Sequence, residues 1–347
     1  MPALALPAKP NGSTGAVPSS SGRMQWMDLL RGFCMLTVII MHATPAIRLK
    51  TSLESPEAIQ LLNLAFSPYR MPTLMFLSGM LLGRSLKKPL RPYVEGKFYQ
   101  IFWPFLIFSL VVLAAENRMT LSFIAKIPIS SPTLFWYLWF LFAYYIIGFA
   151  MHKARMNFAI IALLSLVASI FLPETLRISR FAYLFSFFAM GHYFMSCPGS
   201  ILRWQPLAWI GLVASLVGSW ISMRGIEIRY TAAYVWAPFG FILVATWVMP
   251  LFRHDSRILH FVEWIGRNSI VFYTVHFPVQ CLTAALMWQL GKWDYMTIYL
   301  TTLAVSILAS VAMQLLRERF LFFAGLYDFS KMKSLGGSLH ALRPFSR

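Results

Sequence analysis

Mostly apolar runs of near-spanning length follow one another along almost the whole chain. A helix needs roughly 20 such residues to cross the hydrocarbon core of a bilayer, and about ten runs approach that length. These runs cover residues 26–45, 71–83, 98–115, 127–151, 156–173, 181–202, 204–223, 230–252, 268–291 and 295–316. The uncharged segment 58–69 is expected at the membrane interface. The pattern predicts an all-α, polytopic membrane protein with about ten transmembrane helices.

The composition points to the same class. The 347 residues are 58% hydrophobic and only 12% charged, with a mean hydropathy of +0.64, which is typical of a membrane protein. The net charge of +18 does not indicate nucleic-acid binding, because Lys and Arg in membrane proteins collect on cytoplasmic loops. The cysteines, Cys34, Cys197 and Cys281, are too scattered to predict a metal site or a disulfide framework.

Three regions are expected along the chain. Residues 1–24 are rich in Pro, Ala, Ser and Gly and lack the apolar core of a signal peptide, which predicts a disordered cytoplasmic tail. Residues 25–320 are expected to form the transmembrane domain, and residues 321–347 a basic cytoplasmic tail. An even number of spans, with the excess of Lys and Arg on one set of segments, places both termini in the cytoplasm. The expected location is the inner (plasma) membrane.

The first span carries three chemically active side chains: Asp28, Arg31 and His42. A charged group inside a bilayer costs several kcal/mol unless it is paired or faces water, so such residues indicate function. The eleven-residue separation of Arg31 and His42 corresponds to about 1100° of helical rotation. Both side chains therefore share a face within roughly 20° and lie roughly 16 Å apart along the axis. The alignment predicts a polar cavity along this helix.

Arg31 and His42 suit different tasks. The planar guanidinium of Arg31 matches a phosphate or a carboxylate, and a neutral imidazole at position 42 can remove a proton from a hydroxyl. Each residue also has a structural interpretation. Arg31 can pair with Asp28 one turn earlier, and His42 can form a hydrogen bond at the interface. The shared face favours function for His42, and Asp28 can orient Arg31 towards an anion while pairing with it.

A basic cluster that includes Arg84 and Lys88 follows the second span. On the side of Arg31, this cluster would extend an anion-binding mouth. For each residue alone, a topology signal or a contact with lipid headgroups is the simpler interpretation.

The ninth span begins EWIGRNSIVFYTVHFP. Ser269 and His276 are seven residues apart and share a face within roughly 20°, and Tyr273 lies on the adjoining turn. Arg267 falls on the opposite side of an ideal helix and is expected to be a cytoplasmic anchor. His276 is either part of a site or a polar residue of the core, and both interpretations stay open.

Three further residues are assigned to supporting or substrate-facing positions. Arg70 borders the short second span at its outer end. Ser78 precedes Gly79 in mid-helix, where small residues indicate close helix packing rather than a nucleophile. Trp139 belongs to an aromatic run that is typical of an interfacial belt, with stacking on a sugar ring as the alternative.

Four segments resemble the acyltransferase-3 family of membrane proteins, which O-acylate sugars and related acceptors. They are DLLRGFCMLTVIIMH, which has the family's signature of an arginine, ten residues and a histidine, then RMPTLMFLSGML, WYLWFLFAYY and GRNSIVFYTVHFP. Their order and the expected spans extend the resemblance over most of residues 25–316. The sequence departs from some members because no hydrolase-like domain follows the last span.

The resemblance implies transfer of an acyl group, usually acetyl, from cytoplasmic acetyl-CoA or another acyl-CoA. The acceptor would be a hydroxyl of a glycan on the outer side, such as an exopolysaccharide or its lipid-linked precursor. Arg31 and His42 match the family's essential arginine and histidine. We expect His42 to act as general base or covalent acyl carrier, and Arg31, Asp28, Arg84 and Lys88 to bind the CoA. No metal is implied, and a homodimer is compatible with the sequence.

The rival function is a transporter of a lipid-linked oligosaccharide or a small anion, because intramembrane Arg and His also suit a substrate or proton path. The lack of a visible inverted repeat counts against it. A scaffold without activity fits poorly with charged side chains placed at such cost.

Overall fold

The computed structural model describes residues 25–116, 118–130, 134–196, 205–252, 256–291 and 293–331, and within these ranges it contains helices and no β-strand. The α-helices are α1 (Gln25–Lys50), α2 (Glu57–Phe66), α3 (Arg70–Met80), α4 (Leu82–Ser85), α5 (Leu90–Lys97), α6 (Trp103–Ala115), α7 (Leu121–Ser130), α8 (Trp136–Lys153), α9 (Phe158–Phe171), α10 (Ile178–Ser196), α11 (Gln205–Met223), α12 (Trp236–Val248), α13 (Arg257–Arg267), α14 (Ser269–Gly291), α15 (Tyr295–Arg319) and α16 (Leu321–Tyr327). The all-α class is therefore confirmed. The tail expected at residues 1–24 lies outside the described residues.

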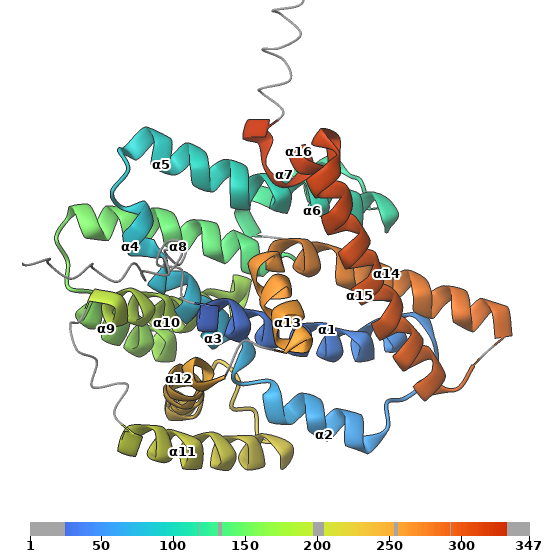
Figure 1. Cartoon of the computed structure of the whole chain (residues 1–347), viewed down its shortest axis with the longest axis horizontal. Helices are drawn as coiled ribbons and strands as arrows, with labels where there is room; N and C mark the ends of the chain where they lie inside the picture. The colour runs from blue at the N-terminus through green and yellow to red at the C-terminus, as the bar shows by residue number, and fades with distance from the viewer. Residues whose placement is uncertain are drawn as a thin grey trace, which may run out of the picture.

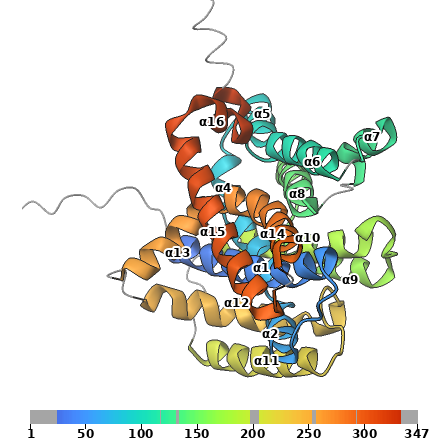
Figure 2. The same cartoon turned by 90° about the vertical axis from the view of Figure 1, so that its right-hand side faces the viewer.

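Helix α1 runs through the middle of the molecule (Figures 1 and 2). It packs against α3, α13, α14 and α15. Helices α2, α11 and α12 lie on one side of it, and α5, α6 and α16 lie on the opposite side. Most of α1 is buried, from Trp26 to Ile47. A helix in this position can carry charged side chains towards internal cavities without exposing them to lipid.

Six helical segments within the described residues are long and apolar enough to cross a membrane. They are Gln25–Lys50, Leu90–Ala115, Gln205–Met223, Ala232–Leu251, Ser269–Gly291 and Tyr295–Arg319. These segments coincide with six of the expected runs. The other expected runs correspond to α3, α8, α9 and α10. Of these, α3 has 11 residues and α9 has 14, which is short for a span.

Two helix boundaries differ from the sequence-based expectation for a shared reason. Helix α1 continues past Pro45 to Lys50, although the apolar run ends at that proline. Helices α5 and α6 join through a π-helical turn, Phe98–Phe102, just before Pro104. A proline removes a single backbone donor, and a neighbouring helix or a locally widened turn accommodates that loss.

The tail expected from residue 321 begins with a folded helix. Helix α16 packs against α6 and α15, and the indole of Trp103 donates to the carbonyl of Gly325 at 2.9 Å. Tyr327 is only 1% exposed, and its hydroxyl lies 3.1 Å from that of Thr274. The expected boundary at residue 320 therefore does not mark the end of the bundle, because aromatic residues beyond it bury against the core. Residues 332–347 lie outside the described part.

Glycines allow the closest helix contacts. A Cβ on Gly266 of α13 would overlap the carbonyl oxygen of Asp28, and one on Gly32 of α1 would overlap that of Val262. Gly79 of α3 meets the carbonyl of Phe188 on α10 in the same way, which confirms the packing interpretation of the small residues beside Ser78. Such contacts are typical of helix packing in membranes.

We expect Gly266→Ala to destabilise the protein, because the added methyl meets backbone atoms of α1 that cannot rotate away. Overpacking of this kind costs about 1–3 kcal/mol. Thermal unfolding of the purified protein in detergent measures the effect. Gly96→Ala is the control, because no atom lies within 4 Å of the position of its Cβ and alanine favours a helix. Equal unfolding temperatures for the two variants would contradict the packing argument.

Candidate functional site

Two cavities follow one another along α1. The Arg31 cavity, of about 360 Å³, is lined by Arg31 and Met35 of this helix. The His42 cavity, of about 270 Å³, is lined by Val38, Met41 and His42 further along the same helix. Helices α3 and α14 also contribute successive turns to both cavities. Both volumes are near the range of about 300–1,000 Å³ that is usual for small-molecule sites.

The Arg31 cavity is strongly basic. Its lining includes four cationic side chains, from Arg31, Lys97, Arg267 and Arg317, and one carboxylate, Asp328. Arg31 is 15% exposed, and its Nη1 lies 3.8 Å from the Asp28 carboxylate, as expected for a residue that is oriented by a partner one turn away. The excess of positive charge suits a ligand with several phosphates.

Aromatic rings hold two of these cations in place. The Lys97 ammonium lies 3.6 Å from the centre of the Tyr145 ring, and the Arg317 guanidinium lies 5.1 Å from that of Tyr327. Cation–π contacts of this kind stabilise a charge while leaving hydrogen-bond donors available. The two cations can therefore bind an anion without first losing a carboxylate partner.

His42 forms a hydrogen bond with a second histidine. Its Nδ1 lies 3.0 Å from Nε2 of His276, and Nδ1 of His276 lies 2.7 Å from the carbonyl oxygen of Phe272. His276 is 1% exposed, whereas His42 lines its cavity. The structure thus brings the candidate residues of the first and ninth spans into direct contact.

The Phe272 carbonyl determines the tautomers of the neutral pair. A carbonyl oxygen only accepts, so Nδ1 of His276 carries the proton and its Nε2 holds a lone pair. Nδ1 of His42 must then donate to that lone pair. The remaining nitrogen of His42, Nε2, is left unprotonated and can act as a base. The backbone of α14 therefore determines, through His276, which nitrogen of His42 is basic.

The His42 cavity is lined by three arginines, Arg70, Arg180 and Arg229, and by no Asp or Glu among the described residues. Arg70 is 4% exposed, and its Nη1 donates to the carbonyl of Thr37 on α1 at 3.2 Å. A guanidinium that is buried beside neutral groups is costly unless an anion joins it. The cavity is therefore suited to negative charge.

Tyr273 lines both cavities. Its ring centre lies 5.4 Å from that of Tyr137 and 6.1 Å from the imidazole of His276, and its hydroxyl donates to the carbonyl of Leu134 at 2.9 Å. The Tyr273 side chain therefore forms part of the wall of each cavity.

Five other candidate residues lie apart from the histidine pair. Ser269 and Ser78 line the Arg31 cavity, and the Ser78 hydroxyl donates to the carbonyl of Leu74. Arg84 lines a different cavity with Lys87 and His192, and Lys88 is exposed and lines neither of the two cavities. The indole of Trp139 donates to the carbonyl of Pro128 at 2.8 Å, away from both cavities.

Sequence reasoning missed several residues of the site. Arg267 was expected on the far side of a continuous helix, but α13 ends at this residue and α14 begins at Ser269. The rotation argument therefore did not apply across Asn268. Arg180 and Arg229 looked like ordinary loop cations, and only their convergence in space distinguishes them. The local sequence signal for these two site residues was an arginine next to an aromatic residue, as in Arg229 before Tyr230.

Comparison with known proteins identifies the family of the chain. The chain matches the family model described as an acyltransferase domain, of the acyltransferase-3 type, over residues 24–315. It is also similar to the inner membrane protein YcfT of Escherichia coli (strain K12), with 23% identity over 315 residues, covering 78% of this chain and 84% of that protein. No solved structure matches the chain. The match to the family model covers most of the chain, and six helices of the described residues are long enough to span a membrane. The chain therefore belongs to the acyltransferase-3 family of membrane proteins.

Proposed function

We propose that the protein is a membrane O-acyltransferase that moves an acyl group, in the first instance acetyl, from cytoplasmic acyl-CoA to a hydroxyl of a glycan. The observation that carries the proposal is the histidine pair, which leaves a basic nitrogen on His42 at the edge of its cavity. The basic Arg31 cavity lies further back along the same helix. About ten segments would cross the inner membrane, with both termini in the cytoplasm.

The charges of the two cavities support this orientation. Lys97 and Arg317 line the Arg31 cavity and belong to segments that the distribution of Lys and Arg assigns to the cytoplasm. Arg180 and Arg229 line the His42 cavity and belong to segments assigned to the outer side. The donor phosphates would bind among the cations of the first cavity, and the acceptor would enter the second. The thioester would reach His42 past Tyr273.

The transfer follows from the base on His42. Nε2 of His42 takes the proton of the acceptor hydroxyl while its oxygen attacks the carbonyl carbon of the thioester. The carbon–sulfur bond breaks, and the imidazolium returns the proton to the departing thiolate. Arg70 lies in the same cavity and is placed to stabilise the negative oxygen of the tetrahedral intermediate. General-base catalysis contributes roughly 10²–10⁴-fold, and positioning supplies much of the rest.

The experiment that tests the proposal uses purified protein in neutral detergent, labelled acetyl-CoA and a glycan acceptor. We expect release of free CoA thiol together with acetylated glycan. A transporter would consume no donor, and such a result would exclude the proposed reaction.

His42→Ala should lower kcat roughly 10²–10⁴-fold, because the base is lost while the donor cavity is unchanged. Acetyl-CoA binding to the variant, measured by equilibrium dialysis, should match that of the wild-type protein. Transfer at a near-normal rate by a well-folded His42→Ala protein would rule out this residue as the base.

His276→Ala should reduce kcat by about tenfold or more, since His42 loses the acceptor that fixes its tautomer. His276→Gln should recover part of the rate, because an amide oxygen can accept the proton of Nδ1. The pH profile of kcat separates this positioning role from simple packing. If His276→Ala and His276→Gln do not differ from each other in kcat or in pH profile, the hydrogen bond between the imidazoles has no catalytic role.

Lys97→Gln and Arg317→Gln should each raise KM for acetyl-CoA about tenfold, which corresponds to about 1.4 kcal/mol. Neither variant should alter KM for S-acetylpantetheine, which lacks the nucleotide phosphates. Lys88→Gln is the matched control, because that side chain is exposed and does not line the cavity. A larger rise in KM for acetyl-CoA with Lys88→Gln would indicate that the phosphates bind at the basic cluster of Arg84 and Lys88 instead.

A further inference from the structure

Two arginines of the His42 cavity have no role in the proposed chemistry. Arg180 lies in the first turn of α10, and Arg229 precedes α12, so neither belongs to the helices that carry the histidine pair. Both side chains line the cavity that His42 lines. Because the two reach it from separate segments, topology signalling does not explain their convergence.

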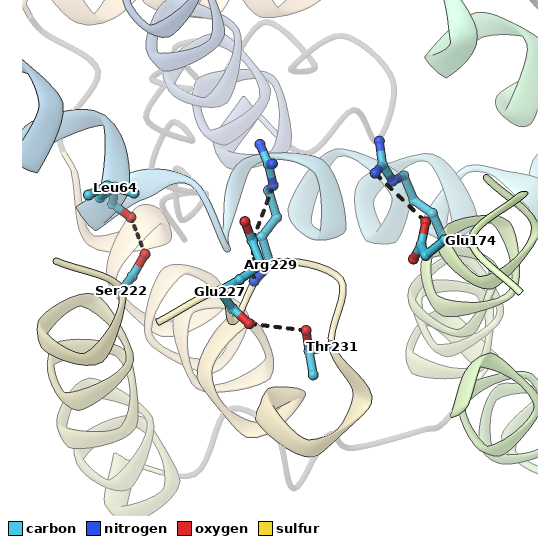
Figure 3. A network of polar contacts seen from close by, with 7 residues as sticks. Leu64, Glu174, Ser222, Glu227, Arg229 and Thr231 are labelled. Carbon is cyan, nitrogen blue, oxygen red and sulfur yellow. Dashed lines mark hydrogen bonds and ion pairs between the residues drawn. The ribbon is translucent and has the colours of Figure 1, made fainter. Parts of the chain in front are cut away.

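Each of these guanidinium groups has a loosely placed acidic neighbour among the described residues. The Arg180 guanidinium lies 3.9 Å from the Glu174 carboxylate, and the Arg229 guanidinium lies 3.6 Å from the Glu227 carboxylate, both beyond hydrogen-bond distance. The Glu227 carboxylate instead accepts from the backbone N–H of Arg229 at 3.1 Å. The glutamates are mostly exposed, at 62% and 69% of their side chains. Figure 3 shows Arg229 beside Glu227 in the loop before α12, with Glu174 at a separate position. Exposed pairs of this geometry contribute little, so the guanidinium charge remains available to the cavity.

Arg180 also has an unused donor. Its Nε is buried and has no hydrogen-bond partner among the described residues. A buried donor without a partner costs about 1–3 kcal/mol, so the position of Arg180 is not favoured by its own hydrogen bonds.

Tyr230 holds the two guanidinium groups together. Its ring centre lies 4.6 Å from the guanidinium carbon of Arg180 and 5.4 Å from that of Arg229. The backbone of Tyr230 has a φ of 64°, in the left-handed region that non-glycine residues rarely adopt. Strain of this kind is found where a site requires a particular side-chain placement.

From these contacts we infer that Arg180 and Arg229 bind an anionic group of the acceptor, so that the natural acceptor is an acidic sugar rather than a neutral one. The inference rests on the proposed function, and it names the acceptor class. The shared chemistry is an oxyanion on the sugar, either the carboxylate of a uronic acid or a phosphate ester. Its hydroxyl lies at Nε2 of His42 and its oxyanion lies between the two guanidinium groups.

The cavity has room for a longer acceptor. An adjoining cavity of about 200 Å³ shares Arg70 and Arg229 with the His42 cavity and continues past Asn63 and Thr44. Polar side chains at these positions suit the hydroxyls of a further sugar. An oligosaccharide could thus extend away from the reacting unit while its acidic group stays at the arginines.

The first test measures ligand-induced stabilisation of the purified protein in neutral detergent. Methyl glucuronide and methyl glucoside form a matched pair of probes that differ in the carboxylate. We expect the glucuronide to raise Tm and the glucoside to leave it unchanged. Arg180→Gln and Arg229→Gln should each weaken glucuronide binding about tenfold or more. Arg224→Gln is the control, because Arg224 lies in the same loop as Arg229 but lines neither cavity.

Two further probes identify the source of the oxyanion. Stabilisation by glucose 1-phosphate that depends on Arg180 assigns the site to a sugar phosphate, and stabilisation by the glucuronide alone assigns it to a uronic acid. Stabilisation by glycerol 3-phosphate as strong as that by either sugar would indicate a lipid headgroup site and overturn the inference. Equal shifts with glucuronide and glucoside would overturn it as well.

The transfer assay separates this inference from the proposed function. With the glucuronide as acceptor, Arg229→Gln should raise the acceptor KM about tenfold while KM for acetyl-CoA stays unchanged. Equal transfer to the glucuronide and the glucoside would disprove the acidic acceptor and leave the acyltransferase intact. If no acetyl-CoA is consumed with the glucuronide, the glucoside or a polysaccharide acceptor, the result would count against the acyltransferase itself.

Discussion

The hydrogen bond between His42 and His276 is the contact on which the site depends. It joins α1 to α14 beside the His42 cavity, and the Phe272 carbonyl gives it a direction. Many catalytic histidines are oriented by a carboxylate, which brings a charge that must also be buried. In the proposed mechanism, an imidazole oriented by the backbone would serve the same purpose without that cost. A site within a membrane bundle would then position its base through neutral groups.

The second constraint is the separation of charge into two places. Cations with aromatic neighbours line the Arg31 cavity, and three arginines line the His42 cavity, while Tyr273 lines both. Helices α1, α3 and α14 supply one turn to each cavity. In the proposed mechanism, adjacent turns of the same helices face the donor and the acceptor, so helical geometry would set the distance between the donor phosphates and the reacting hydroxyl. Closely packed glycines bring α1 against α13 and α3 against α10.

The arrangement also accounts for the roles of the peripheral helices. Helix α10 itself and the loop before α12 each bring an arginine into the His42 cavity, and α16 brings Tyr327 against Arg317 of the other cavity. In the proposed function these elements would contribute ligand-binding groups rather than the base.

The sequence by itself determined the helical class, the position of six spanning helices and the shared face of Arg31 and His42, because hydropathy and helical rotation are local properties. It also identified His276 and Tyr273 as candidates. Only the tertiary structure decided that His276 contacts His42, since the packing of α1 on α14 joins residues that are far apart in the chain. The break at Asn268, the burial of α16 and the convergence of Arg180 and Arg229 were likewise tertiary. The periodic pattern of one segment does not determine which other segment will pack against it.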